Sequence, residues 1–122
     1  MALAAEVAEH VRDLFGGLGP VRVRAMFGGA GIFLDDAMFG LIDGDGEIYL
    51  RGDKALGADL EAEGAARFVY GARGKSIELP YWRLPDAALD DPEEALAWAR
   101  RTLVPAEAAA ARKRQAKSRT KR

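Results

Sequence analysis

The stretch AMFGLI-DGDG-EIYLR, residues 37–51, contains the strongest fold signal in this sequence. Its middle, residues 43–46, holds two Asp-Gly pairs, which supply the positive φ that tight hairpin turns need. The run before the turn, residues 37–42, is apolar on both faces and predicts a central strand. The run after it, residues 47–51, alternates apolar and polar side chains, as a strand with one buried face does. Together these runs predict an antiparallel sheet.

Further strand-like segments lie on both sides of this hairpin. Residues 21–27 alternate apolar side chains with arginine or methionine, and a glycine-rich bend follows. The apolar run 32–34 is split from the central strand by two aspartates, which indicates another hairpin. A third turn, residues 71–74, separates two more segments. The predicted strands cover residues 21–27, 32–34, 37–42, 47–51, 67–70 and 75–79.

Three helices complete the pattern. Apolar residues recur every three or four positions over residues 3–15, which places them on one face of a helix. Residues 54–63 form a short second helix that a glycine closes. Asp91 and Glu94 form a capping box at the start of the third helix. We expect Pro105 to interrupt that helix, because a proline removes a backbone donor and clashes with the preceding turn.

The order of these elements predicts an α+β fold. An antiparallel β-sheet of about five to six strands is expected, flanked by an N-terminal helix, a short middle helix and a C-terminal helix. The chain has 122 residues, which suits one domain. We place that domain at residues 1–104 and expect residues 105–122 to form a basic tail that is helix-prone or disordered.

The tail differs in charge from the rest of the chain. Seven of the 18 basic residues and no acid lie in residues 112–122, which leaves 11 basic against all 19 acidic residues in the rest of the chain, a net charge of −8. Such a tail is either a solvated end or a site that binds nucleic-acid phosphates without sequence preference. The candidate nucleic-acid-binding residues are Arg112, Lys113, Arg114, Lys117, Arg119, Lys121 and Arg122.

The composition argues against several classes of protein. The chain has no cysteine and one histidine, so we expect no metal site, no cofactor and no covalent catalysis. No apolar run approaches the roughly 18 residues that a membrane span requires, so we expect no membrane partner. The acidic start lacks the basic residues of a signal peptide, and a cytoplasmic location is expected.

Three short motifs imitate ligand sites. Residues 74–76 read Gly-Lys-Ser, but the glycine that a phosphate-binding loop needs upstream is Val69, and a strand follows. Residues 28–31 are glycine-rich without dinucleotide-binding spacing, and they suit a tight bend, with a ligand touching the bend as the alternative. Residues 43–47 resemble the start of a calcium loop but lack its later ligands. Each motif is explained by a turn.

Acid–base catalysis is a remote alternative. His10 lies at the edge of the first helix's apolar stripe, where a histidine usually has a structural role. The carboxylate pairs 35–36 and 90–91 fall at turn or cap positions, which accounts for them without catalysis. A catalytic role would need His10 to lie within hydrogen-bond reach of an acid.

The segment Tyr81-Trp82-Arg83 mixes aromatic and basic side chains between two prolines. This combination suits stacking on bases or anchoring a protein interface, and core filling is the alternative. We place it at an edge of the sheet. On that interpretation, replacing Trp82 and Arg83 by alanine would weaken partner capture and leave the fold intact.

The order of these segments resembles the N-terminal domain of the TfoX family, bacterial regulators of natural competence. The resemblance spans roughly residues 6–104, and no single piece of it is specific, whereas six pieces in the same order are. The matching pieces are Met26-Phe27-Gly28-Gly29 with Gly31-Ile32, Met38-Phe39 with Leu41-Ile42, Glu47 to Arg51, Phe68-Val69-Tyr70, Tyr81-Trp82-Arg83 with Pro85, and Asp91-Pro92-Glu93 with Leu96, Trp98 and Ala99.

This resemblance implies a secretion-chaperone-like α+β domain with no established catalytic residue and no cofactor. We therefore expect a non-enzymatic regulatory or protein-binding module, linked to transcriptional or competence regulation, with an unknown protein partner or a second copy as a homodimer. The alternative is a nucleic-acid accessory protein that uses the tail. The expected partner-binding residues are Met26, Phe27, Gly28, Gly29, Gly31, Tyr81, Trp82 and Arg83.

Overall fold

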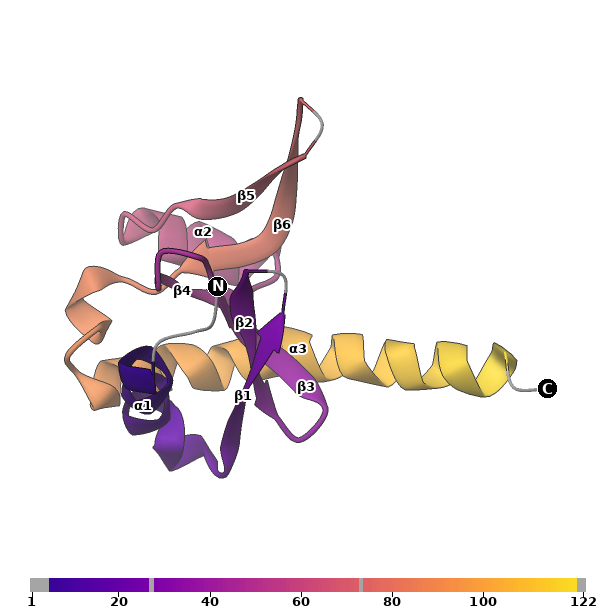
Figure 1. Cartoon of the computed structure of the whole chain (residues 1–122), viewed down its shortest axis with the longest axis horizontal. Coiled ribbons are helices and arrows are strands. Elements are labelled where there is room, and N and C mark those ends of the chain that lie inside the picture. Colours follow the sequence, from indigo (N-terminus) through magenta and orange to yellow (C-terminus); the bar gives the residue numbers. More distant parts are fainter. Residues whose placement is uncertain (1–4, 27, 73, 121–122) are drawn as a thin grey trace.

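A computed structural model gives the fold and describes residues 5–26, 28–72 and 74–120. It has the predicted α+β class, with a six-stranded antiparallel sheet and three α-helices (Figure 1). Two short 3-10 helices cover Gly16–Leu18 and Asp86–Ala88. The main elements are α1 (Ala5–Phe15), β1 (Val21–Met26), β2 (Gly29–Leu34), β3 (Ala37–Ile42), β4 (Ile48–Arg51), α2 (Lys54–Ala62), β5 (Arg67–Ala72), β6 (Lys75–Arg83) and α3 (Pro92–Thr120).

The strands are ordered β1-β2-β3-β4-β6-β5 across the sheet. This order confirms that residues 37–42 form a central strand, since β3 pairs with β2 on one side and β4 on the other. The Asp-Gly turn between β3 and β4 closes with a hydrogen bond from the Gly46 amide to the Asp43 carbonyl, 3.0 Å long. Gly46 has a φ of 85°, the positive value that such a turn requires.

The main core lies on one face of the sheet, under α1 and α3. Phe15 and Phe39 meet edge to face there, with ring centroids 5.6 Å apart. From α3, small side chains at helical spacing enter this core: Ala95, Ala99, Thr102, Ala106 and Ala110 are all buried. Because these side chains are short, the helix backbone can lie close to β3 and β4.

Helix α2 closes the far end of the core over β6. Asp53 caps it by accepting a hydrogen bond from the Leu56 amide, 2.8 Å long. Leu56 and Leu60 pack against Trp82 of β6, and Trp98 of α3 joins this cluster to the main core. The three helices therefore enclose one continuous apolar layer.

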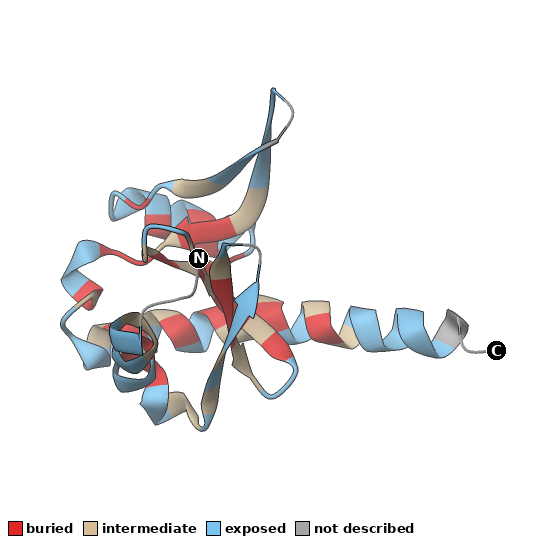
Figure 2. Cartoon of the chain, in the orientation of Figure 1, coloured by how far each residue is buried: buried red, intermediate tan, exposed pale blue. Residues whose placement is uncertain are grey.

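The prediction that Pro105 interrupts the third helix is wrong. Helix α3 runs unbroken from Pro92 to Thr120 and projects beyond the sheet (Figure 1). A proline inside a helix costs about 3 kcal/mol, but Ala106 and Ala110 continue the buried stripe past it and offset that cost by packing. Burial then fades along the projecting end (Figure 2). No helix in the described residues could cross a membrane.

Strand β6 is also longer than predicted, because it continues through Pro80 to Arg83. Proline has no amide hydrogen to donate, and the register with β5 shifts opposite it, between Arg67 and Val69. The Arg67 side chain donates instead to the Leu79 carbonyl, 2.9 Å away. Strand β6 thus pairs with β5 from Lys75 to Trp82, across this irregularity, and with β4 from Tyr81 to Arg83.

The glycine-rich bend between β1 and β2 is a close backbone approach, as its structural interpretation predicted. Gly28 has a φ of 79° in the turn. A Cβ on Gly29 would lie 2.1 Å from the Ile42 carbonyl oxygen of β3. Only glycine fits there without moving backbone.

We expect Gly29→Ala to lower the free energy of unfolding by about 3 kcal/mol, because the added methyl collides with a strand backbone. Urea denaturation followed by circular dichroism measures this. Gly16→Ala is the matched control: no atom lies within 4 Å of the added Cβ, so its unfolding midpoint should stay within error of the wild type. Equal midpoints for all three proteins would contradict the proposed close approach.

Candidate partner-binding groove

The face of the sheet opposite the core, here called the open face, is defined by strand register. Residues directly opposite each other in antiparallel strands point to the same side. Gly31 of β2 pairs with Arg24 of β1 on one side and with Leu41 of β3 on the other. Leu41 in turn pairs with Tyr49 of β4, and Tyr49 pairs with Arg83 of β6, so these residues form one row across the sheet. The row beside it pairs Arg22 with Phe33 and Phe33 with Met38. This face therefore mixes apolar and cationic side chains.

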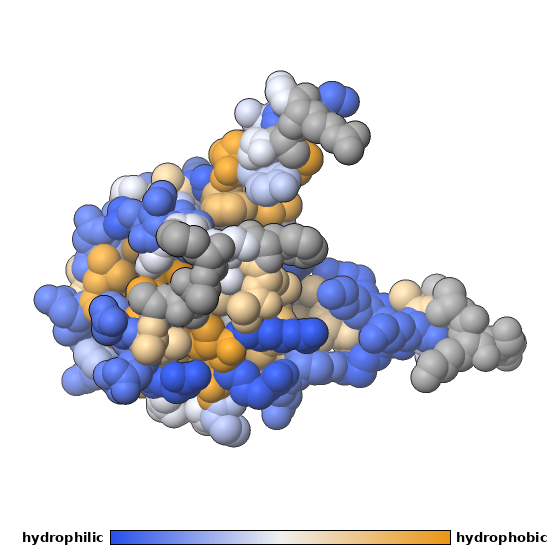
Figure 3. Space-filling view, viewed as in Figure 1, coloured by the Kyte–Doolittle hydropathy of each residue, from blue (hydrophilic) through white to orange (hydrophobic). Residues whose placement is uncertain are grey.

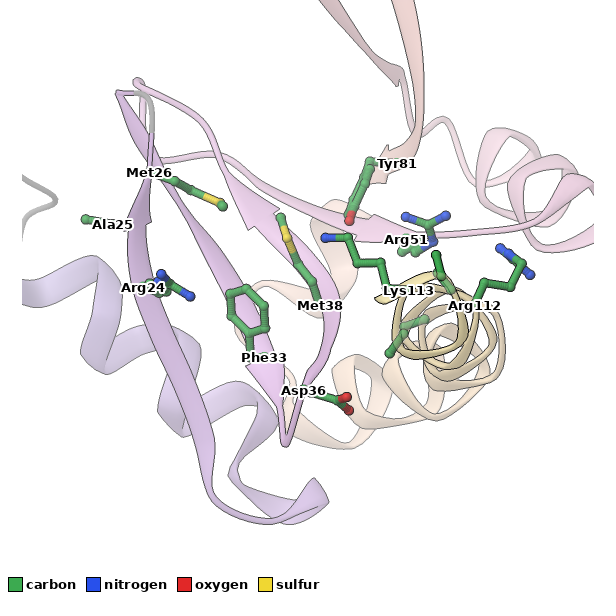
Figure 4. Close-up of a pocket in the computed structure, with 14 residues that line it drawn as sticks. Arg24, Ala25, Met26, Phe33, Asp36, Met38, Arg51, Tyr81, Arg112 and Lys113 are labelled. Carbon is green, nitrogen blue, oxygen red and sulfur yellow. The ribbon is translucent and has the colours of Figure 1, made fainter. Parts of the chain in front are cut away.

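A groove of about 850 Å³ lies between the open face and the C-terminal part of α3. Its size falls within the usual range of ligand pockets. Figure 4 shows side chains of β1, β2 and β3 on one side and α3 on the other, with Lys113 pointing toward Met38 and Tyr81. The groove is lined by Arg24, Ala25, Met26, Phe33, Asp36, Met38, Arg51, Tyr81, Ala106, Ala109, Ala110, Arg112, Lys113 and Ala116.

Apolar side chains form the floor of the groove. A Cβ on Gly31 would meet the Phe33 ring at 2.8 Å, the Met26 sulfur at 3.0 Å and the Met38 methyl at 3.2 Å. These three side chains therefore occupy the space that a side chain at Gly31 would need. Met26 is 37% exposed. Methionine side chains are flexible and polarizable, so such a floor can adapt to a partner's shape.

The two aromatic rings of the groove are already covered by arginines. The Arg22 guanidinium lies 5.5 Å from the centre of the Phe33 ring, and that of Arg51 lies 5.6 Å from the Tyr81 ring. Tyr81 itself is only 6% exposed. The Nε atom of Arg51 is buried and has no hydrogen-bond partner in the described part of the chain. These rings hold arginines in place and leave little aromatic surface for a ligand.

The charge of the groove is positive. Its lining contains four cations, Arg24, Arg51, Arg112 and Lys113, and one carboxylate, Asp36. That carboxylate is neutralised by an ion pair with Arg114 of α3. No ion pair of Arg24, Arg112 or Lys113 occurs within residues 5–26, 28–72 and 74–120. The groove therefore presents uncompensated positive charge.

The Asp36–Arg114 pair ties the end of α3 to the turn between β2 and β3. The hydrogen bond from Arg114 holds the pKa of the Asp36 carboxyl below its ordinary value, with the guanidinium's charge acting in the same direction. A lowered pKa in the folded state means that the pair stabilises the fold above the carboxyl's unfolded pKa. This contribution is lost as the pH falls through the folded pKa.

We expect Arg114→Ala to raise the pKa of Asp36, since the hydrogen bond that stabilises its charged form is removed. Titration of the side-chain carboxyl carbon by NMR measures this. Arg112→Ala is the control, because Arg112 is not a partner of Asp36, and it should leave the titration midpoint unchanged. An unshifted Asp36 in the Arg114 variant would rule out this tie.

The family comparison agrees with the resemblance found in the sequence. The sequence model of the family described as the TfoX N-terminal domain matches residues 13–106 of this chain. This chain belongs to the TfoX N-terminal domain family. No curated protein matches it.

Only part of the predicted surface of this TfoX N-terminal domain lies in the groove. Met26 lines it, and Gly31 lies beneath its floor. Gly28 and Gly29 serve the turn and the close approach to β3. Phe27 lies outside the described residues.

The placement of Tyr81, Trp82 and Arg83 at a sheet edge is wrong. They lie in β6 and pair with β4, and Trp82 also pairs with Arg67 of β5. Tyr81 lines the groove, but Trp82 points to the core face and is 5% exposed. Arg83 is half-buried and forms ion pairs with Glu47 and Asp86. The interior position arises because β6 bridges β4 and β5.

Trp82 has a structural role. Its indole Nε1 donates to Glu61 of α2 at 2.7 Å, and Arg67 stacks on its ring at 4.7 Å. A Cβ on Gly57 of α2 would come within 2.3 Å of this ring. A second cleft of about 440 Å³ lies beside it, but the ring itself is packed between β6 and α2.

We expect Trp82→Ala to lower the free energy of unfolding by about 3–5 kcal/mol, since it leaves a large cavity under α2. Arg83→Ala should cost at most about 1 kcal/mol, because its ion pairs are partly exposed. Chemical denaturation of both single variants measures the difference. Equal losses would contradict the core position of Trp82.

In this TfoX N-terminal domain, some cations of the predicted tail lie at the groove and others lie farther along the exposed end of α3. Arg112 and Lys113 line the groove, and Arg114 pairs with Asp36. Lys117 lies farther along the exposed helix. Arg119 is in the helix, and Lys121 and Arg122 lie outside the described residues. The first residues of the tail therefore lie against the sheet and line the groove.

Several groove residues were missed from the sequence: Arg24, Phe33, Met38, Arg51 and the alanines of α3. The alternation of Arg22 and Arg24 with valines does indicate one polar face of β1. The spacing of alanines from Ala95 to Ala110 also continues in step across Pro105. Neither pattern predicts that the C-terminal part of α3 lies beside the open face, because that contact joins distant parts of the chain.

The other motifs occupy structural positions. His10 Nε2 lies 2.6 Å from the Leu89 carbonyl oxygen, and no acid is its partner in the described part of the chain. Gly74 has a φ of 76° in the β5–β6 hairpin, as a turn requires. Asp43 accepts hydrogen bonds from the Asp45 and Glu47 amides, which organises its own turn. Among the described residues, no group of three or more His, Cys, Asp or Glu could hold a metal ion.

Proposed function

We propose that this chain is a non-catalytic regulatory module, linked to transcriptional or competence regulation, that binds a protein partner in its groove. The observation that supports this most directly is the groove itself, with its apolar floor and cationic rim on the sheet face opposite the core. An apolar centre surrounded by polar groups is typical of protein interfaces. Membership in the TfoX N-terminal domain family supports the regulatory role.

The shape of the surface also favours the groove over the β5–β6 arm as the place where a partner binds. Figure 3 shows an open angle between the β5–β6 arm and the projecting end of α3. The groove itself is lined from β1, β2, β3, β4, the end of β6 and α3. Exposed apolar side chains occur at Met26 in the groove and also on the arm, at Val69, Tyr70 and Ile77. The arm has no comparable hollow among the described pockets. A concave apolar site excludes water from a partner more completely than an exposed strand does.

We expect Met26→Gln with Met38→Gln to abolish capture of the partner by the immobilised full chain. These changes keep side-chain length and net charge but make the floor polar. Capture from nuclease-treated extract of the organism that encodes the chain, quantified by mass spectrometry, measures this. Val69→Gln with Ile77→Gln on the arm is the matched control and should capture the same proteins as the wild type. Circular dichroism establishes that all variants are folded.

Three results would count against this proposal. Capture that survives the groove variant but fails in the arm variant would move the contact to the arm, including contact with a second copy. Retention of nucleic acid from untreated extract that is lost on deleting residues 112–122, without any protein lost in the groove variant, would favour the nucleic-acid alternative. A covalently processed substrate in the extract would contradict a non-catalytic role.

A further inference from the structure

The groove's charge is opposite in sign to the body of the chain. Outside residues 112–122 the net charge is −8, yet the groove concentrates four cations around one neutralised carboxylate. Those cations come from three separate parts of the chain: β1, β4 and α3. The fold thus collects positive charge at one concave place on an acidic molecule.

We propose that the groove takes an acidic peptide segment whose apolar side chains lie on one face. This inference rests on the proposed function and names the partner's chemistry. The apolar face would lie on Met26, Met38 and the α3 alanines, and its carboxylates would reach Arg24 on one wall and Lys113 on the other. Amphipathic segments bind apolar grooves in this way.

Charge also gives this groove its selectivity. The net charge of the body repels an acidic segment, whereas the groove attracts it, so repulsion and attraction act together to favour the groove. Complementary charge increases the rate of encounter and weakens as salt is added. A basic segment would instead be drawn to the body and repelled from the groove.

The groove suits a peptide better than a nucleic acid. Single-stranded nucleic acids bind by stacking bases on aromatic faces, but arginines lie over the Phe33 and Tyr81 rings. The rest of the floor between the cations consists of methionine and alanine side chains. Desolvating phosphates over such a floor is unfavourable, whereas desolvating leucine-like side chains is favourable.

The test uses the full chain and a fluorescein-labelled helical peptide of about 14 residues, roughly four turns. This acidic probe has leucine on one face and glutamate on the other. One comparison peptide has lysine in place of glutamate, and a second has serine in place of leucine. A labelled oligo-thymidine strand of similar length serves as the nucleic-acid probe. Fluorescence anisotropy measures each dissociation constant at low and high salt.

We expect the acidic probe to bind at least about tenfold more tightly than both comparison peptides and the oligo-thymidine, and to weaken with salt. In the variant Arg24→Glu with Lys113→Glu, the dissociation constant of the acidic probe should be at least about tenfold higher than in the wild type. Both side chains are exposed, so the fold should tolerate the change. Arg12→Glu with Arg100→Glu is the matched control, since it changes net charge equally at exposed positions outside the groove and should bind as the wild type does.

Several results would overturn this inference. Equal binding of the serine or lysine peptide would show that the apolar face or the charge is not recognised. Tighter binding of oligo-thymidine that is lost in the Arg24 and Lys113 variant would assign the groove to nucleic acid. Equal loss of probe binding in the groove variant and in the Arg12 and Arg100 control would show that only the net charge of the chain matters. If the acidic probe fails while the Met26 and Met38 variant still loses its partner from extract, only the partner's chemistry is wrong and the proposed function stands.

Discussion

The packing of small α3 side chains against β3 and β4 is the constraint on which the rest of the structure depends. Ala95, Ala99, Ala106 and Ala110 are all buried on one stripe, and their short side chains let the helix lie close to the sheet. Larger side chains would hold the helix away and open voids in a layer that proteins pack densely. The same stripe maintains the helix across Pro105, where backbone chemistry alone would favour a break.

That contact links the core to the groove. Because α3 stays helical past the sheet, it carries Arg112 and Lys113 to the groove and Arg114 to Asp36. The helix residues that complete the core are thus followed directly by residues that complete a surface site. The Asp36–Arg114 pair is exposed and adds little stability by itself. Its geometric effect is to tie the helix end beside the β2–β3 turn.

Much of the fold could be predicted from local chemistry, and much of the site could not. The Asp-Gly turn, the Asp91 cap and the alternation of residues 21–27 depend on a few neighbouring residues, and they predicted elements close to those found. Tyr81-Trp82-Arg83 was misplaced because two flanking prolines suggest an edge, whereas β6 passes through Pro80 with a bulge. The groove cations were separated in sequence by up to 89 positions, from Arg24 to Lys113, and no local pattern relates them.

The sequence by itself determined the family, the α+β class, the central strand and the glycine-requiring bend, because these follow from periodicity, turn chemistry and the order of short segments. Tertiary structure alone decided that Trp82 is buried, that the helix survives Pro105 and that basic residues of the tail line a groove on the sheet. The reason is physical: local preferences of roughly 1–3 kcal/mol can be outweighed by burial against distant residues, and a concave surface exists only once distant segments pack together.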